Sequence, residues 1–399
     1  MGDSWLLCNG DQIDRKEYFE LSEIVPDYPD GTWTSSGVPS GASIWGVFMV
    51  GDMVIRYGSY TGGNNNRIAA IWYARNGNEW ARSVVLDESG NSYSNAVTSM
   101  IYVDGRYFAG VSKSGGSGLG SIYYCTTLGG SWTYIGGSVA STYDFLRLAS
   151  DGTYLYWMAR SSSSGSAMSS NVYRKPLSDL ASAPIFLVQL TNTASEPPGF
   201  IQYVNGCIFI GQAVRTLNTS NYTHELYYST DGKTFAKKTF PTFAANSQPS
   251  LMGVAYIEGE YHLIKTTSNN SKIQLLSSKT VDFATYTERV PHDIKFLTSN
   301  ALYAYAGPYT YANGLHMFAY ALGLDFRICV AAISNPDTIL MYDTGIRGSI
   351  DRMWTYIGAN DEWCFAGVGQ AMAKQAFGTI TLPEISLADT AYTYIKAKE

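Results

Sequence analysis

The stretch Val97-Thr-Ser-Met-Ile-Tyr-Val-Asp-Gly-Arg-Tyr-Phe-Ala-Gly-Val111 holds the pattern that decides the fold. Apolar and aromatic residues flank Asp104-Gly105, which suits the two-residue loop of a β-hairpin because both residue types tolerate a positive φ. Two further strand-like runs, Ser121 to Thr127 and Trp132 to Gly136, follow a loop rich in Gly and Ser. The segment therefore predicts four short antiparallel strands in a row.

The same tight-turn signal recurs along the whole chain. Gly51 in the first copy and Asn360 in the last lie 309 positions apart over six intervals (360 − 51), so the mean period is about 52 residues. The seven signals are Val50-Gly51-Asp52, Asp104-Gly105, Asp151-Gly152, Asn205-Gly206, Glu258-Gly259, Asn313-Gly314 and Asn360-Asp361. Seven four-stranded units repeated around an axis predict an all-β, seven-bladed β-propeller.

The repeat also predicts the domain organisation. Residues 34–399 are expected to form the propeller, and residues 1–33 a separate N-terminal segment and linker. A stack of unrelated hairpins or a pair of β-sandwiches is the alternative, but sandwiches do not keep one period over seven copies. We expect the ring to close through a strand near residues 32–36 or one near residues 391–396, since an open sheet edge invites aggregation.

One copy of the turn between the two outer strands of a unit carries a more specific motif. Ser229-Thr-Asp-Gly-Lys-Thr-Phe235 resembles the Asp-box of sialidase-like propellers, although it is one residue shorter and ends in Phe. Its expected role is structural: Ser229 and Asp231 bond turn amides, and Phe235 packs between strands. The structural residues of this motif are Ser229, Asp231, Gly232, Thr234 and Phe235.

The N-terminal segment differs from the repeats because it is short, charged and partly helical in pattern. Tyr18, Leu21 and Val25 stand at helical spacing after Asp14, a suitable helix cap. The run resembles the collar microdomain of bacteriophage tail fibres at these positions: Trp5, Leu6, Leu7, Cys8, Asn9, Gly10, Arg15, Tyr18 and Leu21.

This resemblance implies a virion protein of the tail, baseplate or fibre, assembled in the cytoplasm of a bacterial host. Trp5, Leu7, Tyr18 and Leu21 would then contact other virion proteins. The alternative is a simple cap that packs Trp5 and Leu7 onto one blade. Homo-oligomerisation is left open.

Composition limits the partners. A net charge of −6 and a pI near 5.3 argue against a nucleic-acid partner, because phosphate binding needs a basic surface. No run of 18 apolar residues and no signal peptide are present, so we expect no membrane insertion. The five cysteines lie far apart, which indicates buried free thiols in a reducing compartment.

The long, variable loops are expected to emerge on one face of the ring, where ligand contacts concentrate. They are rich in Ser, Asn, Gly and Tyr, which suits polar recognition of a host-surface glycan or receptor. The candidate ligand-binding residues are Tyr60, Asn65, Arg67, Tyr93, Tyr143, Tyr222, His224 and Tyr309.

No catalytic residue, metal site or cofactor is expected. No carboxylate pair of the glycosidase kind stands out, and the four histidines lack metal-ligand spacing. The sequence therefore predicts a non-catalytic, receptor- or glycan-binding virion protein. The alternatives are a sialidase-like enzyme that acts on glycans and a generic interaction scaffold.

Overall fold

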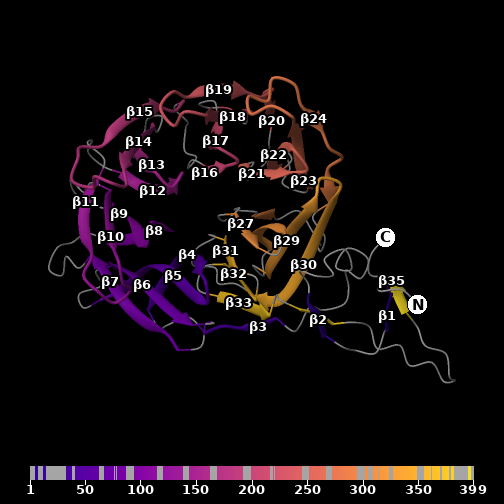
Figure 1. Ribbon diagram of the computed structural model, residues 1–399, viewed down its shortest axis with the longest axis horizontal. Helices are drawn as coiled ribbons and strands as arrows, with labels where there is room; N and C mark the ends of the chain where they lie inside the picture. The colour runs from indigo at the N-terminus through magenta and orange to yellow at the C-terminus, as the bar shows by residue number, and fades with distance from the viewer. Residues whose placement is uncertain are drawn as a thin grey trace.

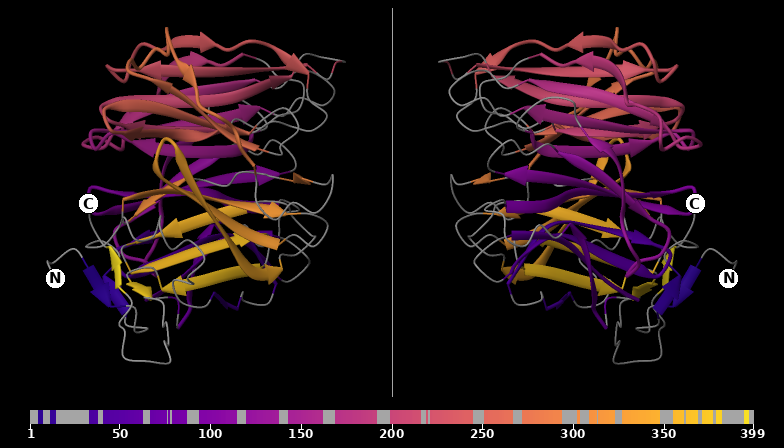
Figure 2. Two further views of the ribbon diagram at one scale, coloured as in Figure 1. Left: turned by 90° about the vertical axis from the view of Figure 1, so that its right-hand side faces the viewer. Right: turned by 90° about the vertical axis from the view of Figure 1, so that its left-hand side faces the viewer.

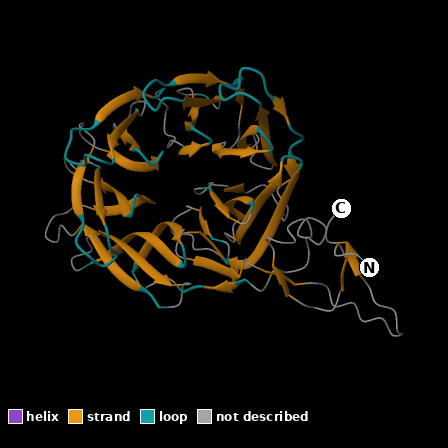
Figure 3. Ribbon diagram, in the orientation of Figure 1, coloured by secondary structure: helices purple, strands orange, loops and turns teal. Residues whose placement is uncertain are grey.

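Every regular element that the structure describes is a β-strand (Figure 3). None of the described residues forms a helix that could cross a membrane. The computed structural model describes residues 5–7, 12–14, 33–37, 41–62, 67–75, 77, 79–86, 94–114, 120–137, 143–161, 169–191, 199–215, 219, 221–244, 251–266, 272–293, 302–303, 309–312, 314–322, 327–347, 355–360, 362–368, 371–376, 379–381 and 394–396.

Seven antiparallel sheets stand around a central axis, which confirms the predicted seven-bladed β-propeller (Figure 1). Seen edge-on, the strands cross the thickness of the ring (Figure 2). Blades 1 to 3, each from the inner to the outer strand, are β4 (Ala42–Val50), β5 (Met53–Thr61), β6 (Arg67–Arg75) and β7 (Ala81–Leu86); β8 (Ser94–Val103), β9 (Arg106–Ser114), β10 (Ser121–Cys125) and β11 (Thr133–Gly137); and β12 (Tyr143–Ser150), β13 (Tyr154–Ser161), β14 (Ser170–Pro176) and β15 (Ile185–Gln189).

The next three blades vary this plan. Blades 4 and 5 each carry a short extra strand beside the third strand, and the inner strand of blade 6 is in two pieces. Their strands are β16 (Phe200–Val204), β17 (Cys207–Arg215), β18 (Asn221–Ser229), β19 (Ala236–Thr239) and β20 (Phe243–Ala244); β21 (Leu251–Ile257), β22 (Glu260–Thr266), β23 (Lys272–Ser278), β24 (Thr287–Glu288) and β25 (His292–Asp293); and β26 (Leu302–Tyr303), β27 (Thr310–Ala312), β28 (Leu315–Leu322), β29 (Arg327–Asn335) and β30 (Thr338–Arg347).

Blade 7 closes the ring with a strand from the other end of the chain. It holds β31 (Thr355–Ala359), β32 (Trp363–Val368), β33 (Ala371–Ala376) and, outermost, β3 (Thr34–Ser35). Thr34 pairs with Lys374, and the Ser36 amide donates to the Met372 carbonyl at 2.8 Å. The first of the two expected closures is therefore observed.

The C-terminal alternative does not close the ring. β35 (Tyr394–Lys396) pairs with β1 (Trp5–Leu7), and β34 (Thr379–Thr381) pairs with β2 (Gln12–Asp14). These two small sheets lie beside the ring, where the two termini come together (Figure 1). The helix expected from Tyr18 to Val25 lies outside the described residues.

The seven sequence signals fall between the first and second strands of the seven blades. Asp104 and Gly105 have φ of 52° and 70°, and Asn205 and Gly206 have φ of 45° and 80°. Positive φ at both central residues matches the turn that follows the twist of a hairpin. We call the side of the ring with these turns the tight-turn face, and the side with the connections between second and third strands the long-loop face.

The core consists of separate clusters, and the larger ones are each shared by two neighbouring blades. Blades 2 and 3 share Phe108, Trp157 and Tyr173, and the Trp157 and Tyr173 rings stack at 5.7 Å. Blades 7 and 1 share Tyr356 and Trp72 in the same way. Each large side chain buried between blades contributes roughly 2 kcal/mol, so the interfaces rather than one central core hold the ring together.

Four cysteines are buried free thiols, as expected: Cys125, Cys207, Cys329 and Cys364. Burial raises the pKa of Cys125 and of Cys207 to about 11, so both stay protonated near neutral pH. Cys8 lies outside the described residues.

Candidate functional site

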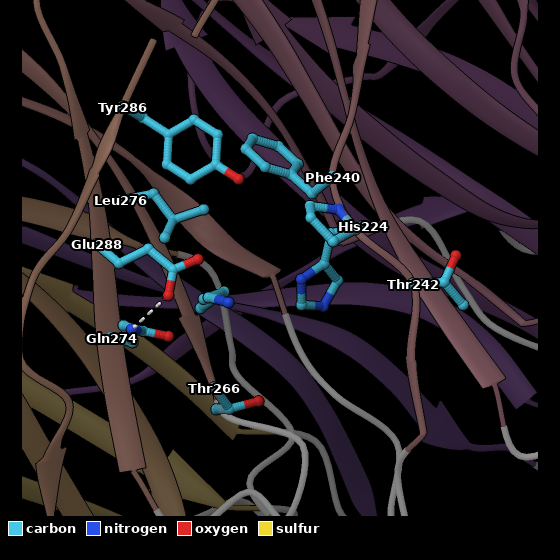
Figure 4. A pocket seen from close by; sticks show the side chains of 10 residues that line it. His224, Phe240, Thr242, Thr266, Gln274, Leu276, Tyr286 and Glu288 are labelled. Carbon is cyan, nitrogen blue, oxygen red and sulfur yellow. Dashed lines mark hydrogen bonds between the residues drawn. The ribbon is translucent and has the colours of Figure 1, made fainter.

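A pocket of about 290 Å³ lies between blades 4 and 5, on the long-loop face (Figure 4). Its walls come from β18 and the segment after β19 in blade 4, and from β22, β23 and β24 in blade 5. The lining residues are His224, Phe240, Pro241, Thr242, Lys265, Thr266, Gln274, Leu276, Tyr286 and Glu288.

The alternation of β18 directs His224 toward blade 5. Side chains two residues apart in a strand share a face. Leu226 packs in the cluster shared with blade 5, whereas Tyr227 packs in the cluster shared with blade 3. His224 shares the side of Leu226 and is almost fully buried. Its carbonyl accepts the Phe240 amide at 2.9 Å, which fixes the segment that forms the opposite edge of the pocket.

The pocket combines two charged groups with a neutral imidazole. Burial, aided by the charge of Lys265, lowers the pKa of His224 to about 3, so this histidine is neutral near pH 7. Burial also lowers the pKa of Lys265, and the Glu288 carboxylate partly offsets that effect. Glu288 and Lys265 therefore influence each other across a small space that is partly shielded from water.

An amide and two aromatic rings complete the walls. Gln274 Nε2 donates to Glu288 Oε2 at 3.4 Å (Figure 4), and it also donates to the Arg289 carbonyl at 3.2 Å. Phe240 and Tyr286 meet edge to face, with centroids 5.4 Å apart. These contacts hold a carboxylate and an amide beside a rigid aromatic wall.

This arrangement can bind a ligand that is rich in hydroxyl groups. Carboxylate, amide and ammonium groups bond hydroxyls from several directions, and aromatic faces pack on the apolar side of a sugar ring. The lining contains one carboxylate, Glu288. Among the described residues, no group of three or more His, Cys, Asp or Glu could hold a metal ion.

The residues expected from the sequence are not brought together. Tyr222 and His224 lie in blade 4 and are buried, whereas Tyr60 and Arg67 lie at strand ends in blade 1. Tyr60 is half-buried beneath the Arg82 guanidinium, 4.2 Å from its ring centroid. Of the candidates that the structure describes, His224 alone lines the pocket between blades 4 and 5.

The remaining four candidates fall elsewhere. Tyr143 begins β12, while Asn65 and Tyr93 lie outside the described residues. Tyr309 was expected on the long-loop face, and this placement is corrected: it lies next to β27, near the tight turn of blade 6, against His316. The inner strand of blade 6 is interrupted, so the position of Tyr309 could not be inferred from the regular repeat.

Sequence reasoning missed Lys265, Gln274, Tyr286 and Glu288. Two of them carry a recognisable signal, because Lys265 and Gln274 are polar residues inside the apolar runs of β22 and β23. A polar side chain at a buried strand position is more informative than an exposed polar residue in a loop.

The Asp-box-like turn lies on the tight-turn face, away from the pocket. Asp231 Oδ1 accepts the amides of Lys233 and Thr234 at 2.7 and 2.8 Å and the Ser229 hydroxyl at 2.9 Å. These hydrogen bonds lower the pKa of the Asp231 carboxyl. Phe235 packs against the cluster shared by blades 3 and 4. The contacts are local to the turn and its neighbouring blade.

Fold and pocket together define a β-propeller protein with a polar pocket between two blades. No protein-family model matches the chain, and no curated protein matches it either. A solved structure of a puromycin-hydrolysing peptidase from Mycobacterium tuberculosis aligns at 13% identity and a TM-score of 0.52, over 91% of this chain and 57% of that one.

Other solved structures align less closely. A Trypanosoma rangeli sialidase in complex with 2,3-difluorosialic acid aligns at 12% identity and a TM-score of 0.46, over 86% of this chain and 58% of that one. An α-L-arabinofuranosidase from Fusarium graminearum aligns at 12% identity and a TM-score of 0.43, over 71% and 92%. The chain thus spans little more than half of the peptidase and the sialidase. At these identities the likeness concerns the fold.

The sequence-based prediction that the protein is not an enzyme is corrected. The peptidase that shares the propeller is described as hydrolysing puromycin, so this fold occurs in a hydrolytic enzyme. The absence of a recognisable catalytic motif in the sequence therefore does not support the exclusion of enzymatic activity.

Proposed function

We propose that the protein binds a hydroxyl-rich ligand of the carbohydrate class in the pocket between blades 4 and 5. One observation carries the proposal: Lys265, Glu288 and Gln274 converge there beside the rings of Phe240 and Tyr286. Such a set offers donors, acceptors and an aromatic face within about 290 Å³, close to the lower size limit of ligand pockets.

The biological setting that we propose is a phage virion, in which the propeller presents this pocket to a glycan of the bacterial surface. The support comes from the collar-like run Trp5 to Leu21. Its β1 and β2 pair with the C-terminal strands beside the ring. We expect this run to contact tail or baseplate proteins, and the long-loop face to bind the ligand.

An array of sialylated and neutral bacterial-surface glycans tests the binding. The intact chain should bind at least one glycan, and Gln274→Ala and Glu288→Gln should each weaken that binding about tenfold, as expected for loss of a hydrogen bond to a charged group. Gln189→Ala and Glu362→Gln are matched controls, because both side chains are exposed on other blades. They should bind like the unchanged protein.

Two results would contradict the proposal: no glycan binds, or the pocket variants bind as well as the controls. Mass spectrometry of the bound glycan shows in the same experiment whether it is cleaved. Mass spectrometry of purified virions tests the setting separately, because absence of the chain from virions would remove the phage role and leave the binding proposal standing.

A further inference from the structure

A tyrosine recurs at one position of the repeat, two residues before the tight turn. It occupies this place in blades 2, 4, 5 and 6, as Tyr102, Tyr203, Tyr256 and Tyr311. Their exposed fractions are 43%, 45%, 38% and 58%, so large aromatic surfaces face solvent on the inner strands around the axis. Repeated exposure of large aromatic side chains in one place is typical of a binding surface.

Three of these tyrosines border one cavity of about 430 Å³. Inner-strand residues of blades 3, 4, 5 and 6, together with the start of β28, form its walls, so it lies at the axis beside the tight turns. The lining residues are Ala149, Ser150, Gln202, Tyr203, Val204, Tyr256, Tyr309, Tyr311 and His316.

Blade 3 provides the space for this cavity. Ala149 stands two residues before Asp151-Gly152, at the place that tyrosine occupies in the four other blades. Its methyl group fills far less of the axis than a phenol ring. Blade 3 therefore contributes no aromatic ring at this position of the cavity, which the tyrosines of blades 4, 5 and 6 line.

The lining contains no Asp, Glu, Lys or Arg. Its polar atoms come from phenols, a Ser hydroxyl, an amide and an imidazole. Gln202 Oε1 accepts the Val254 amide at 2.9 Å, which leaves Gln202 Nε2 as a donor. Tyr309 and His316 are hydrogen-bonded to each other, and burial lowers the pKa of His316 to about 4, so the imidazole is neutral near pH 7.

We propose that this axial cavity is a second binding site, which takes an uncharged saccharide. A pyranose ring has an apolar face of C–H groups and hydroxyls around its edge. Tyrosine rings match the face, and phenol hydroxyls together with the Gln202 amide match the edge. A charged ligand would have no ionic partner among the lining residues. The site is independent of the pocket between blades 4 and 5, which lies on the other face.

The competing explanation is that the tyrosines only stabilise their hairpins. Tyr256 lies across from Tyr261 with centroids 4.8 Å apart, and Tyr102 lies across from Tyr107 with centroids 4.6 Å apart. Such cross-strand aromatic pairs are stabilising by themselves. Tyr102 does not line the cavity, so Tyr102→Ala is a matched control that removes the same pair from another blade.

Calorimetric titration with cellobiose, maltose, lactose and N,N′-diacetylchitobiose tests the proposal. At least one of these disaccharides should bind the intact chain. Tyr256→Ala and Tyr311→Ala should weaken that binding about tenfold, since each removes a stacking face. Tyr102→Ala should keep the original affinity within about twofold, and so should Glu362→Gln, whose side chain is exposed on blade 7. Thermal unfolding identifies any variant that fails to fold. Tyr203→Ala, which removes the third stacking face of the cavity, then takes its place and should weaken binding about tenfold.

The proposal is overturned if none of the four disaccharides binds, or if Tyr102→Ala weakens binding as much as Tyr256→Ala. It is also overturned if Glu288→Gln abolishes disaccharide binding, because the ligand would then occupy the pocket on the long-loop face. Failure of the proposed glycan pocket shows a different pattern, in which Glu288→Gln and Gln274→Ala have no effect on the array.

Discussion

The two faces of the ring build their cavities in different ways. On the long-loop face, the pocket between blades 4 and 5 combines residues of different types, such as Lys265, Gln274 and Glu288. On the tight-turn face, the axial cavity uses one position of the repeat, filled by tyrosine in Tyr203, Tyr256 and Tyr311. The first site combines different residue types at one interface between blades, and the second uses one position of the repeat.

The difference shows what a repeat fold can offer a ligand. A repeated position gathers similar side chains around the axis, so its chemistry is uniform and here uncharged. A site between two blades can collect different residue types, because each interface has its own sequence. Loop variability alone therefore does not show which face binds.

The largest expected effect concerns the rigidity of the tight-turn face. Gly232 has φ of 63°, and an added Cβ would overlap the Tyr156 hydroxyl, which bonds Asp151 of the neighbouring blade at 2.8 Å. Gly232→Ala should lower the free energy of unfolding by about 3 kcal/mol, from backbone strain and overpacking together. Urea denaturation followed by tryptophan fluorescence measures this change.

A matched variant separates the backbone strain of a positive φ from the steric overlap with Tyr156. Gly152 has φ of 85° but no atom within 4 Å of an added Cβ. Gly152→Ala should therefore cost only the backbone strain, about 1 kcal/mol. Equal losses for the two variants would contradict the claim that the turns of blade 4 pack tightly against blade 3.

Both sites contain a buried neutral histidine, which predicts the pH dependence of stability. The pKa is about 3 for His224 and about 4 for His316, both below the usual value. Between pH 6.5 and about 4 the unfolded chain therefore binds more protons than the folded one, so the free energy of unfolding falls as the pH falls. Urea titrations at stepped pH should show this slope.

His224→Gln should reduce that slope without removing it, because His316 titrates in the same direction. A stability that stays constant from pH 6.5 to pH 4 would show that neither imidazole is buried as described. A slope that disappears completely in His224→Gln would assign the whole effect to the long-loop face.

Much of the fold could be predicted because its signals are local. Asp104-Gly105 and the equivalent turns specify positive φ within two residues, and their period specifies the number of blades. The strand Thr34–Ser35 was expected as one of two closures, but the pairing of Tyr394–Lys396 with Trp5–Leu7 was not. Pairing between the two ends of the chain has no local signature.

The candidate sites were harder to predict for the same reason. Lys265 and Glu288 meet only because β22 and β24 flank β23, and His224 joins them across a blade interface. Tyr309 was misplaced because β26 and β27 break the regular inner strand of blade 6. Which of these side chains lie close together depends on strand register and on the packing of neighbouring blades, and both are tertiary properties.

The smallest expected effect concerns charges at the tight turns. Arg75 and Asp52 form an ion pair at 3.7 Å between two exposed side chains of blade 1. Asp52→Asn should change the free energy of unfolding by less than about 0.5 kcal/mol, because water screens such pairs. A much larger loss of the free energy of unfolding in urea denaturation would mean that exposed charges on the tight-turn face contribute to stability.

Hydrogen-exchange mass spectrometry tests the glycan pocket most directly, with the glycan that the array selects. Binding there should slow amide exchange in the pocket segments of blade 5, around Lys265 to Gln274 and Tyr286 to Glu288. Exchange in β21 (Leu251–Ile257), on the axial side of the same blade, should not change. Unchanged exchange in the pocket segments, or protection confined to β21, would contradict the account.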